Sequence, residues 1–328
     1  MNKFTPCLSI ISPTREGFSQ HWLASLLKIK GNVELILVNP PGLDPHPTND
    51  PRLIQIVSPL RGEMIQRMTG LLSASGQYTL TINCDEYLHP DILAIAKNYF
   101  EQYPDSWMVR LRKAKNVQFG EIERQDLPWG SLMSCDDMKV LPVDKRLNVT
   151  PTDRDVLAEI PIAPLNYPFK LRTFLKPRQD QHGRHTENFD KKIWKTELVK
   201  SALSGIYHSL KLLGPIKYVP FWCLDRLLGL SLQARFFEEG KIIGHHLPWP
   251  EQLRTENNPP EYRAKNRYYV LAEILLVRQY PQYGYLWNLM VEHAKDVMIM
   301  LRQDLGFKSK TKKAPKLSAK QTNVSGKS

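Results

Sequence analysis

The segment that decides the fold of this 328-residue chain is DPRLIQIVSPLRGEMIQRMTGLLSASGQYTLTINCDEYLHPD, residues 50–91. Two short apolar runs in it, at 53–58 and 78–82, have the composition of buried strands. Between them, residues 61–73 carry apolar side chains at helical spacing. A strand, a helix and a second strand in this order are typical of a mainly parallel sheet covered by helices.

The same alternation continues on both sides of this segment. Further strands are expected at 8–12, 33–38 and 107–112, and further helices at 18–29 and 90–103. Prolines recur over 113–180, where we expect loops and short strands. From about 187 the pattern becomes helical, with two long amphipathic helices predicted at 261–280 and 283–305. The sequence therefore predicts an α/β domain followed by a helical C-terminal region.

The positive charge of the chain is concentrated at its end. The formal charge is +12, but residues 308–328 carry seven lysines and no acid, which leaves 38 basic and 33 acidic residues before them. We expect a disordered basic tail behind a mildly basic body that suits an anionic ligand. Four widely spaced cysteines without a CxxC pair favour a reducing, cytoplasmic location. No secretion signal, membrane-spanning helix or nucleic-acid motif is predicted.

Ligands of a parallel α/β sheet bind beyond the carboxyl ends of its strands. The loops to inspect are therefore 13–17, 39–44, 58–62 and 83–89. None contains GxGxxG or GxxxxGK[ST], which disfavours dinucleotide oxidoreductases and P-loop NTPases. Asn83-Cys84-Asp85-Glu86 directly follows a strand, and its oxygen atoms could hold a divalent cation on a diphosphate. Taken alone, the same residues could form an ordinary polar turn.

The order of these features resembles the central block of family 2 glycosyltransferases of the GT-A fold. The matching residues are Arg61-Gly62, Arg67, Gly70, Ala74, Gly76, Gln77, Tyr78, Asn83, Asp85, Glu86, Pro90 and Asp91. The loop at 12–15 is similar to the family's nucleotide-binding entry loop. The resemblance implies a GT-A catalytic domain over 1–205, with a donor half (1–112) and an acceptor half (113–205). A helical region (206–307) and the tail (308–328) would follow.

The resemblance also assigns roles to individual residues. Nucleotide-sugar contacts are expected from Pro13, Thr14, Arg15, Arg61, Gly62, Arg67, Asn83 and Asp85. Ligands for Mg²⁺ or Mn²⁺ are expected from Asp85, Asn83, Glu86 and His185. Two departures from the family pattern stand out: Asn83 replaces the usual first Asp of the metal motif, and Asn39-Pro40-Pro41 replaces an acid that contacts the nucleoside.

The acceptor half should supply the general base of an inverting reaction. The candidate segment is residues 182–190, HGRHTENFD. Glu187 aligns with the first acid of the family motif and is the expected base, with Asp190 second. Alternatively, Thr186 caps a helix and Asp190 is an acid of its first turn.

Other candidates have simpler explanations. Asp153-Arg154-Asp155 matches an Asp-x-Asp motif, but it precedes a helix-like run at 156–160, so we expect helix capping. Four histidines are candidate ligands for a metal or a phosphate, although a lone histidine is more often structural. They are His182, His185, His245 and His246.

The sequence as a whole predicts a metal-assisted glycosyltransferase that uses a nucleotide sugar, with UDP-sugars among the candidates. Its acceptor could be a glycan, a lipid-linked glycan or a protein. A cytoplasmic enzyme that touches the inner face of a membrane fits the basic tail. The alternative is a non-catalytic protein that keeps the GT-A fold and binds nucleotide sugars. A nucleic-acid or membrane-surface protein that acts through its tail is the weakest alternative.

Overall fold

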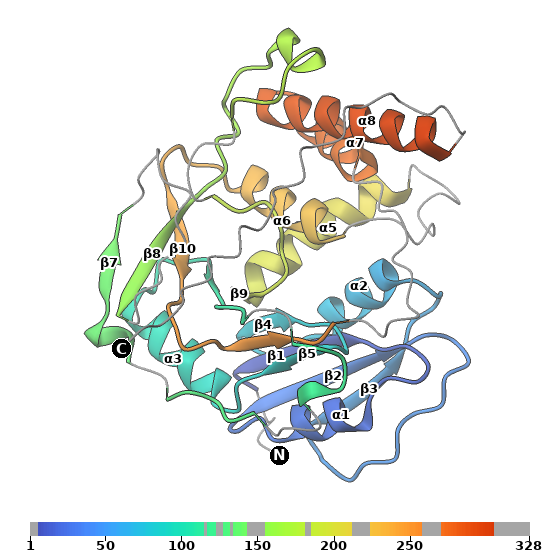
Figure 1. The fold of residues 1–328 in the computed structure, drawn as a ribbon, viewed down its shortest axis with the longest axis vertical. Coiled ribbons are helices and arrows are strands. Elements are labelled where there is room, and N and C mark those ends of the chain that lie inside the picture. Colours follow the sequence, from blue (N-terminus) through green and yellow to red (C-terminus); the bar gives the residue numbers. More distant parts are fainter. Residues whose placement is uncertain are drawn as a thin grey trace, which may run out of the picture.

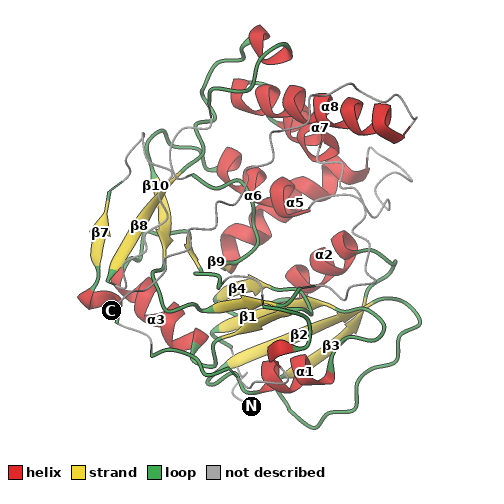
Figure 2. Ribbon diagram, in the orientation of Figure 1, coloured by secondary structure: helices red, strands yellow, loops and turns green. Residues whose placement is uncertain are grey.

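The computed structural model describes residues 6–114, 117–122, 127–131, 134–142, 155–180, 185–211, 224–257 and 270–304. Within these ranges one nine-stranded sheet forms the centre of the molecule (Figures 1 and 2). Its strands, in spatial order, are β3 (Leu53–Val57), β2 (Val33–Asn39), β1 (Leu8–Pro13), β4 (Tyr78–Thr81), β9 (Lys192–Lys195), β6 (Met108–Arg110), β10 (Ile242–His246), β8 (Val156–Pro161) and β7 (Lys139–Leu141).

The sheet is mostly parallel, as the sequence predicts. Strands β3, β2, β1 and β4 run parallel to one another. Strand β9 is inserted between β4 and β6 and runs antiparallel to both. Strand β10 is parallel to β6 and antiparallel to β8, and β7 is parallel to β8. The carboxyl ends of β1, β2, β3, β4 and β6 therefore share one edge with the amino end of β9.

Alternating side chains along the strands create an apolar core on each face of the sheet. On one face, Ile10 and Leu35 pack with α1 (Gln20–Leu27) and α3 (Ile92–Gln102). Ile11 and Ile36 point the other way and pack with α2 (Glu63–Ser73). Beyond α2, Figure 1 shows further helices stacked on this second face. They are α5 (Thr196–Lys211), α6 (Leu224–Arg235), α7 (Val270–Gln279) and α8 (Gly284–Asp304).

Two glycines of the family-like block serve packing. A Cβ on Gly70 would lie 2.3 Å from Cγ2 of Ile11, so the glycine lets α2 sit directly on β1. The backbone N–H of Gly76 donates to Oγ of Ser9 at 2.8 Å and to Oε1 of the buried Glu34 at 3.1 Å. A Cβ on Gly76 would lie 2.8 Å from the backbone nitrogen of Ser9. This part of the motif therefore serves the packing of α2 and the following turn against β1.

A second, two-stranded sheet lies beside α1. Strands β5 (Glu86–Leu88) and β11 (Leu253–Thr255) pair antiparallel, with Thr255 opposite Glu86. The indole N–H of Trp22 in α1 donates to the backbone oxygen of Glu86 at 2.8 Å. This pairing holds the chain that leaves β4 against a segment about 170 residues further on.

Several local predictions are wrong. Residues 156–160 form part of strand β8 and not a helix, so Asp155 caps no helix. The backbone oxygen of Asp155 accepts the N–H of Lys139, the first residue of β7, at 2.7 Å. Asp153 and Arg154 lie outside the described residues. The range 206–307 is not purely helical, because it supplies β10 and β11. A Cβ on Gly244 would lie 1.9 Å from the backbone oxygen of Met108, so β10 depends on this glycine to approach β6.

The predicted tail, 308–328, lies outside the described residues. So does 261–269, the first part of a predicted long helix whose remainder forms α7. None of the described helices combines the length and the apolar character that crossing a membrane requires.

Candidate functional site

The loop after β1 is fixed against the end of β2. Pro13 is the last residue of β1, and the hydroxyl of Thr14 donates to Oδ1 of Asn39 at 2.6 Å. The side-chain amide of Gln66 in α2 donates to the backbone oxygens of Thr14 and Val38, at 2.9 and 2.7 Å. The predicted entry loop is thus rigid up to Thr14, and its exposed Arg15 follows at the edge of the sheet.

Asp85 offers a carboxylate oxygen at this edge. Its Oδ1 is buried and has no hydrogen-bond donor among the residues that the structure describes. Burial raises the pKa of Asp85, and the positive charge of Arg15 opposes this shift. The backbone oxygen of Asp85 accepts the N–H of Glu256 at 2.9 Å, which fixes the turn from the β11 side. An unpaired buried carboxylate oxygen next to an arginine suits a cation bound to an anionic ligand.

Asn83 and Arg67 bind each other. Oδ1 of Asn83 accepts from Nη2 of Arg67 at 2.7 Å, and Nη1 of Arg67 donates to the hydroxyl of Thr81 at 3.0 Å. The guanidinium is 3% exposed and also pairs with Glu63 at 3.1 Å and Asp225 at 3.4 Å. A guanidinium this close to Oδ1 repels a cation, and its own donors are occupied. The geometry therefore disfavours Asn83 as a metal ligand and Arg67 as a diphosphate contact.

Glu86 and His185 also have other partners. Oε2 of Glu86 accepts the N–H of Asn83 at 2.9 Å inside the protein, where burial raises the pKa of Glu86 to about 7. Nε2 of His185 lies 3.0 Å from the hydroxyl of Tyr285 in α8. Among the described residues, no three His, Cys, Asp or Glu side chains gather closely enough to hold an ion by themselves. A divalent cation would fit with Asp85 as a charged protein ligand and with phosphate oxygens and waters in other positions, as Mg²⁺ commonly binds.

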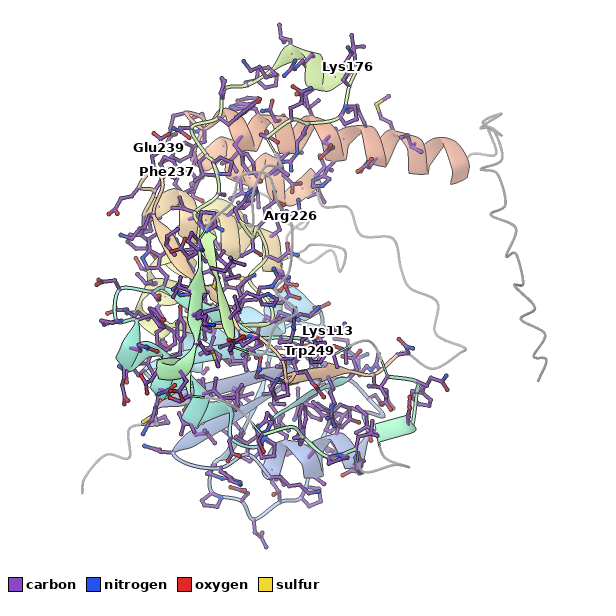
Figure 3. All side chains as sticks on the ribbon, turned by 60° about the vertical axis from the view of Figure 1, so that its left-hand side comes forward. Lys113, Lys176, Arg226, Phe237, Glu239 and Trp249 are labelled. Atoms are coloured by element: carbon purple, nitrogen blue, oxygen red, sulfur yellow. The ribbon has the colours of Figure 1, made fainter. Side chains whose placement is uncertain are left out.

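Two lysines at this edge were not predicted from the sequence. Lys113 follows β6 and forms a bridge with Leu253 of β11; it is labelled in Figure 3. Burial and the charge of Lys191 lower the pKa of Lys113, whereas Glu86, Asp85 and Asp190 act in the opposite direction. Lys113 follows β6 and Lys191 precedes β9, so both lysines lie at the edge that also carries Asp85 and Asp190. Lys113 could have been found by inspecting the loop after the strand predicted at 107–112; Lys191 gives no such signal, because β9 was not predicted.

Asp190 reaches the same edge because β9 runs antiparallel to its neighbours. The backbone oxygen of Lys191 accepts the N–H of Leu111 at 2.9 Å, beside the end of β6. Lys191 has φ of 58°, a left-handed conformation that costs a non-glycine residue about 1 kcal/mol or more. The buried ammonium of Lys192 donates to the backbone oxygens of Asn188 and, at 3.4 Å, Asp190. The loop that presents Asp190 is thus held in a strained conformation by buried contacts.

The electrostatic surroundings of Asp190 favour its ionised form. Burial raises its pKa, but the charges of Lys192, Lys191 and Arg67 outweigh burial and hold the pKa of Asp190 below its usual value. Nζ of Lys191 lies 3.6 Å from its Oδ2, and the side chain is 22% exposed. An ionised, partly accessible carboxylate at the edge can accept a proton.

Glu187, the residue predicted as the base, is enclosed by partners. Its Oε2 lies 3.0 Å from Nη1 of Arg226, and its Oε1 lies 3.4 Å from Nη2 of Arg178 and accepts the hydroxyl of Tyr285. Burial raises the pKa of Glu187, but Arg226, Arg178 and the Tyr285 hydrogen bond lower it below its usual value. Figure 3 shows Arg226 between the sheet and the outer helices. Glu187 therefore anchors the loop to α6 and α8.

The helix-capping alternative for this loop is wrong. Residues 185–190 contain no helix; β9 follows, and α5 begins only at Thr196. Thr186 is buried, and its backbone oxygen accepts the side-chain amide of Gln233 in α6 at 2.7 Å. Asp190 is accordingly not a first-turn acid.

The remaining candidates lie apart from Asp85 or have structural partners. Arg61 is exposed, and its Nη2 donates to the backbone oxygen of Pro41 at 3.3 Å. Gly62, with φ of 137°, is the N-cap residue that precedes α2. Nδ1 of the buried His245 lies 2.8 Å from the hydroxyl of Tyr99, and burial lowers its pKa to about 4. Burial likewise lowers the pKa of His246 to about 3. His182 lies outside the described residues.

A groove of about 750 Å³ opens elsewhere on the molecule. It lies between the end of α1, the start of α3 and the loop around Trp129, and its lining includes Lys30, His89 and Asn98. None of the described residues that were predicted to bind the nucleotide sugar lines this groove.

Comparison with known proteins gives solved structures only; no family model and no curated protein matches. S. aureus TarS 1–349 in complex with UDP-GlcNAc matches with a TM-score of 0.46 and 14% identity, covering 83% of this chain and 66% of that one. The same fragment with UDP gives 0.48 and 14%, covering 93% and 75%. Full-length S. aureus TarS gives 0.43 and 13%, covering 84% and 43%.

The buried Glu86 makes a pH-dependent contribution to stability. Because folding raises its pKa from 4.5 to about 7, its contribution is greatest below pH 4.5 and is lost as the pH rises towards 7. Glu86→Gln keeps an acceptor for the N–H of Asn83 but cannot ionise. We expect the unfolding free energy of this variant, relative to the original protein, to rise by roughly 2 kcal/mol between about pH 5.5 and about pH 8.5.

Urea unfolding at both pH values measures this difference. Glu101→Gln is the matched control, because Glu101 is exposed on α3. A stability difference for Glu86→Gln that does not change with pH would contradict the burial of an ionisable Glu86.

Proposed function

We propose that this chain is a glycosyltransferase that moves a sugar from a nucleoside-diphosphate donor to an acceptor hydroxyl. The observation that carries the proposal is that the ends of β4, β6 and β9 bring Asp85, Lys113 and Asp190 to one edge of the sheet, where Nζ of Lys191 lies 3.6 Å from Oδ2 of Asp190. Open α/β sheets bind ligands at this edge, and the cations suit a diphosphate. The ordered family-like block at 50–91 supports the same assignment.

The donor would lie between the loop after β1 and the turn after β4. Arg15 and Lys113 would attract the diphosphate, and Asp85 would hold Mg²⁺ or Mn²⁺ on it. When bound, such a cation neutralises the diphosphate as a leaving group. Asn39, which is buried and bonded to Thr14, takes the place of the acid expected near the nucleoside. A UDP-sugar is the first donor to test.

In the proposed reaction, the acceptor oxygen attacks the anomeric carbon on the face opposite the diphosphate. A bond forms between that oxygen and carbon while the bond from the carbon to the diphosphate oxygen breaks. The nucleoside diphosphate leaves with the bonding electrons, and the acceptor proton passes to Asp190. We assign the base to Asp190 in preference to Glu187, since Glu187 has two arginine partners and a tyrosine hydrogen bond. Lys192 would act as a positioning residue for Asp190.

The second candidate function is binding of a nucleotide sugar without turnover. The pairing of Asn83 with Arg67 favours it, because Asp85 then supplies the charged oxygen alone where the family motif usually offers two acids. The proposed acceptors remain a glycan, a lipid-linked glycan or a protein hydroxyl, and the proposed location is cytoplasmic, in contact with a membrane.

Binding of the donor is tested by thermal shift against nucleoside diphosphates and nucleotide sugars, with and without Mn²⁺. We expect nucleotides that carry one particular nucleobase to raise Tm, and we expect Mn²⁺ to increase this shift. Asp85→Ala should abolish the Mn²⁺-dependent part, because it removes the charged ligand, whereas Asp105→Ala, at an exposed acid after α3, should leave it intact. The absence of any nucleotide-dependent shift in the original protein would contradict the proposed donor site.

The base is tested by the release of nucleoside diphosphate from the donor that binds, with water as the acceptor. Asp190→Asn should reduce turnover at least about 100-fold, as expected for loss of a general base, with donor affinity little changed. Glu187→Gln should mainly lower Tm, because it weakens two partly buried ion pairs. If Glu187→Gln abolished turnover at unchanged Tm while Asp190→Asn stayed active, the assignment would be reversed. Donor binding without turnover in the original protein, with every acceptor class supplied, would favour the non-catalytic alternative.

A further inference from the structure

The segment before Arg178 forms a projecting tip with exposed apolar side chains. It contains the short helix η2 (Leu171–Phe174), and Figures 1 and 3 show it at the extremity of the molecule beyond α8, with Lys176 labelled there. Leu171 is 73% exposed, Phe174 55% and Leu175 89%. Single exposed apolar residues are common, but three within five positions of a projecting segment indicate an interaction surface.

The tip is held in place by α8. Oδ1 of Asn288 accepts the backbone N–H of Lys170 at 3.0 Å, and its Nδ2 donates to the backbone oxygen of Pro168 at 3.2 Å. Nζ of Lys295 donates to the backbone oxygen of Thr173. Asn288 is buried, so these bonds are shielded from water. The apolar side chains are therefore presented outward by a fixed backbone.

Positive charge surrounds the apolar residues of the tip. Lys170, Arg172 and Lys176 alternate with them, and Lys295 lies beneath them on α8. Two more exposed apolar residues of α8, Met298 (56%) and Ile299 (51%), follow Lys295 by three and four positions and so lie on its side of the helix. Asp296 is a neighbouring exposed acid on α8, and the four cations outnumber it.

We propose that this tip docks onto the surface of an anionic lipid bilayer. Leu171, Phe174 and Leu175 would enter the boundary between headgroups and acyl chains, and Lys170, Arg172 and Lys176 would bind the anionic headgroups. Apolar side chains next to lysine and arginine are the pattern of membrane-surface binding, in which apolar burial and attraction to anionic lipid add together. The projecting form of the tip suits insertion into a bilayer, since a protein partner would need a groove to receive it.

This inference does not depend on the proposed reaction, because neither Asp85 nor Asp190 contacts the tip. Arg178, at the base of the tip, pairs with Glu187 of the loop that carries Asp190.

Vesicle co-sedimentation of the full chain tests the proposal, with phosphatidylcholine alone and with phosphatidylglycerol added. The test variant is Leu171→Ser/Phe174→Ser/Leu175→Ser. Its matched control is Ile54→Ser/Val57→Ser/Leu72→Ser, at exposed apolar residues of β3 and α2. We expect the test variant to bind anionic vesicles at least about tenfold more weakly than the original protein. The control should bind like the original protein. All variants keep the lysines of 308–328, so any contribution of the tail is the same in each.

A charge variant covers the case in which the first variant fails to fold. Lys170→Gln/Arg172→Gln/Lys176→Gln keeps the apolar residues and should weaken binding to anionic vesicles at least about tenfold, with little effect on neutral ones. The proposal is overturned if the original protein binds neither kind of vesicle, or if the folded tip variants bind as tightly as it does. A change from dimer to monomer in the tip variant, without a change in vesicle binding, would assign the surface to a second copy of the chain and would also overturn it.

Discussion

The buried guanidinium of Arg67 is the constraint on which the arrangement of the site depends. A charge that is 3% exposed must be paired, and Arg67 takes its partners from its own helix, from β4 and the turn that follows it, and from α6. Burial lowers its pKa, but Asp225 and Glu63 outweigh burial and raise it, so the group stays charged. Because removing one member of a buried ion pair costs about 3–5 kcal/mol, the three elements are held together. Oδ1 of Asn83 is then taken up by Arg67, whereas Oδ1 of Asp85 has no hydrogen-bond partner among the described residues.

The second constraint is the direction of β9. An antiparallel strand between β4 and β6 brings residues about 100 positions after the turn at 83–86 to the same edge of the sheet. The left-handed Lys191 and the buried Lys192 then fix the loop that carries Asp190. Both features cost stability locally, and the surrounding sheet and α6 offset that cost. Strain of this kind is common at functional sites.

The sequence was most informative where structure is local. Short apolar runs predicted β1 to β4, and the family-like spacing around Gly70 and Gly76 reflects direct contacts of α2 and the following turn with β1. It failed where a strand is completed by distant partners: β8 was predicted as a helix, and β9 and β10 were not predicted. A glycine within a run of residues usually disfavours a strand, so Gly244 obscured β10 in the sequence. The structure requires this glycine, because a Cβ on it would lie 1.9 Å from the backbone oxygen of Met108 in β6. The site residues show the same difference between local features, which the sequence reveals, and contacts with distant elements, which it does not. Asp85 could be selected by its position after β4, but the partners of Asn83 and Glu187 come from elements that only folding brings near.

Hydrogen–deuterium exchange with and without a saturating nucleoside diphosphate and Mn²⁺ tests the central claim most directly, because it maps the site without altering a residue. The account predicts slower exchange in peptides that cover 13–17, 83–86 and 111–114, where Arg15, Asp85 and Lys113 surround the proposed diphosphate position. Peptides that cover 28–30 and 127–131, beside the groove at Trp129, should exchange as before. Protection confined to that groove, or no protection at the edge with the ligand bound, would contradict the account.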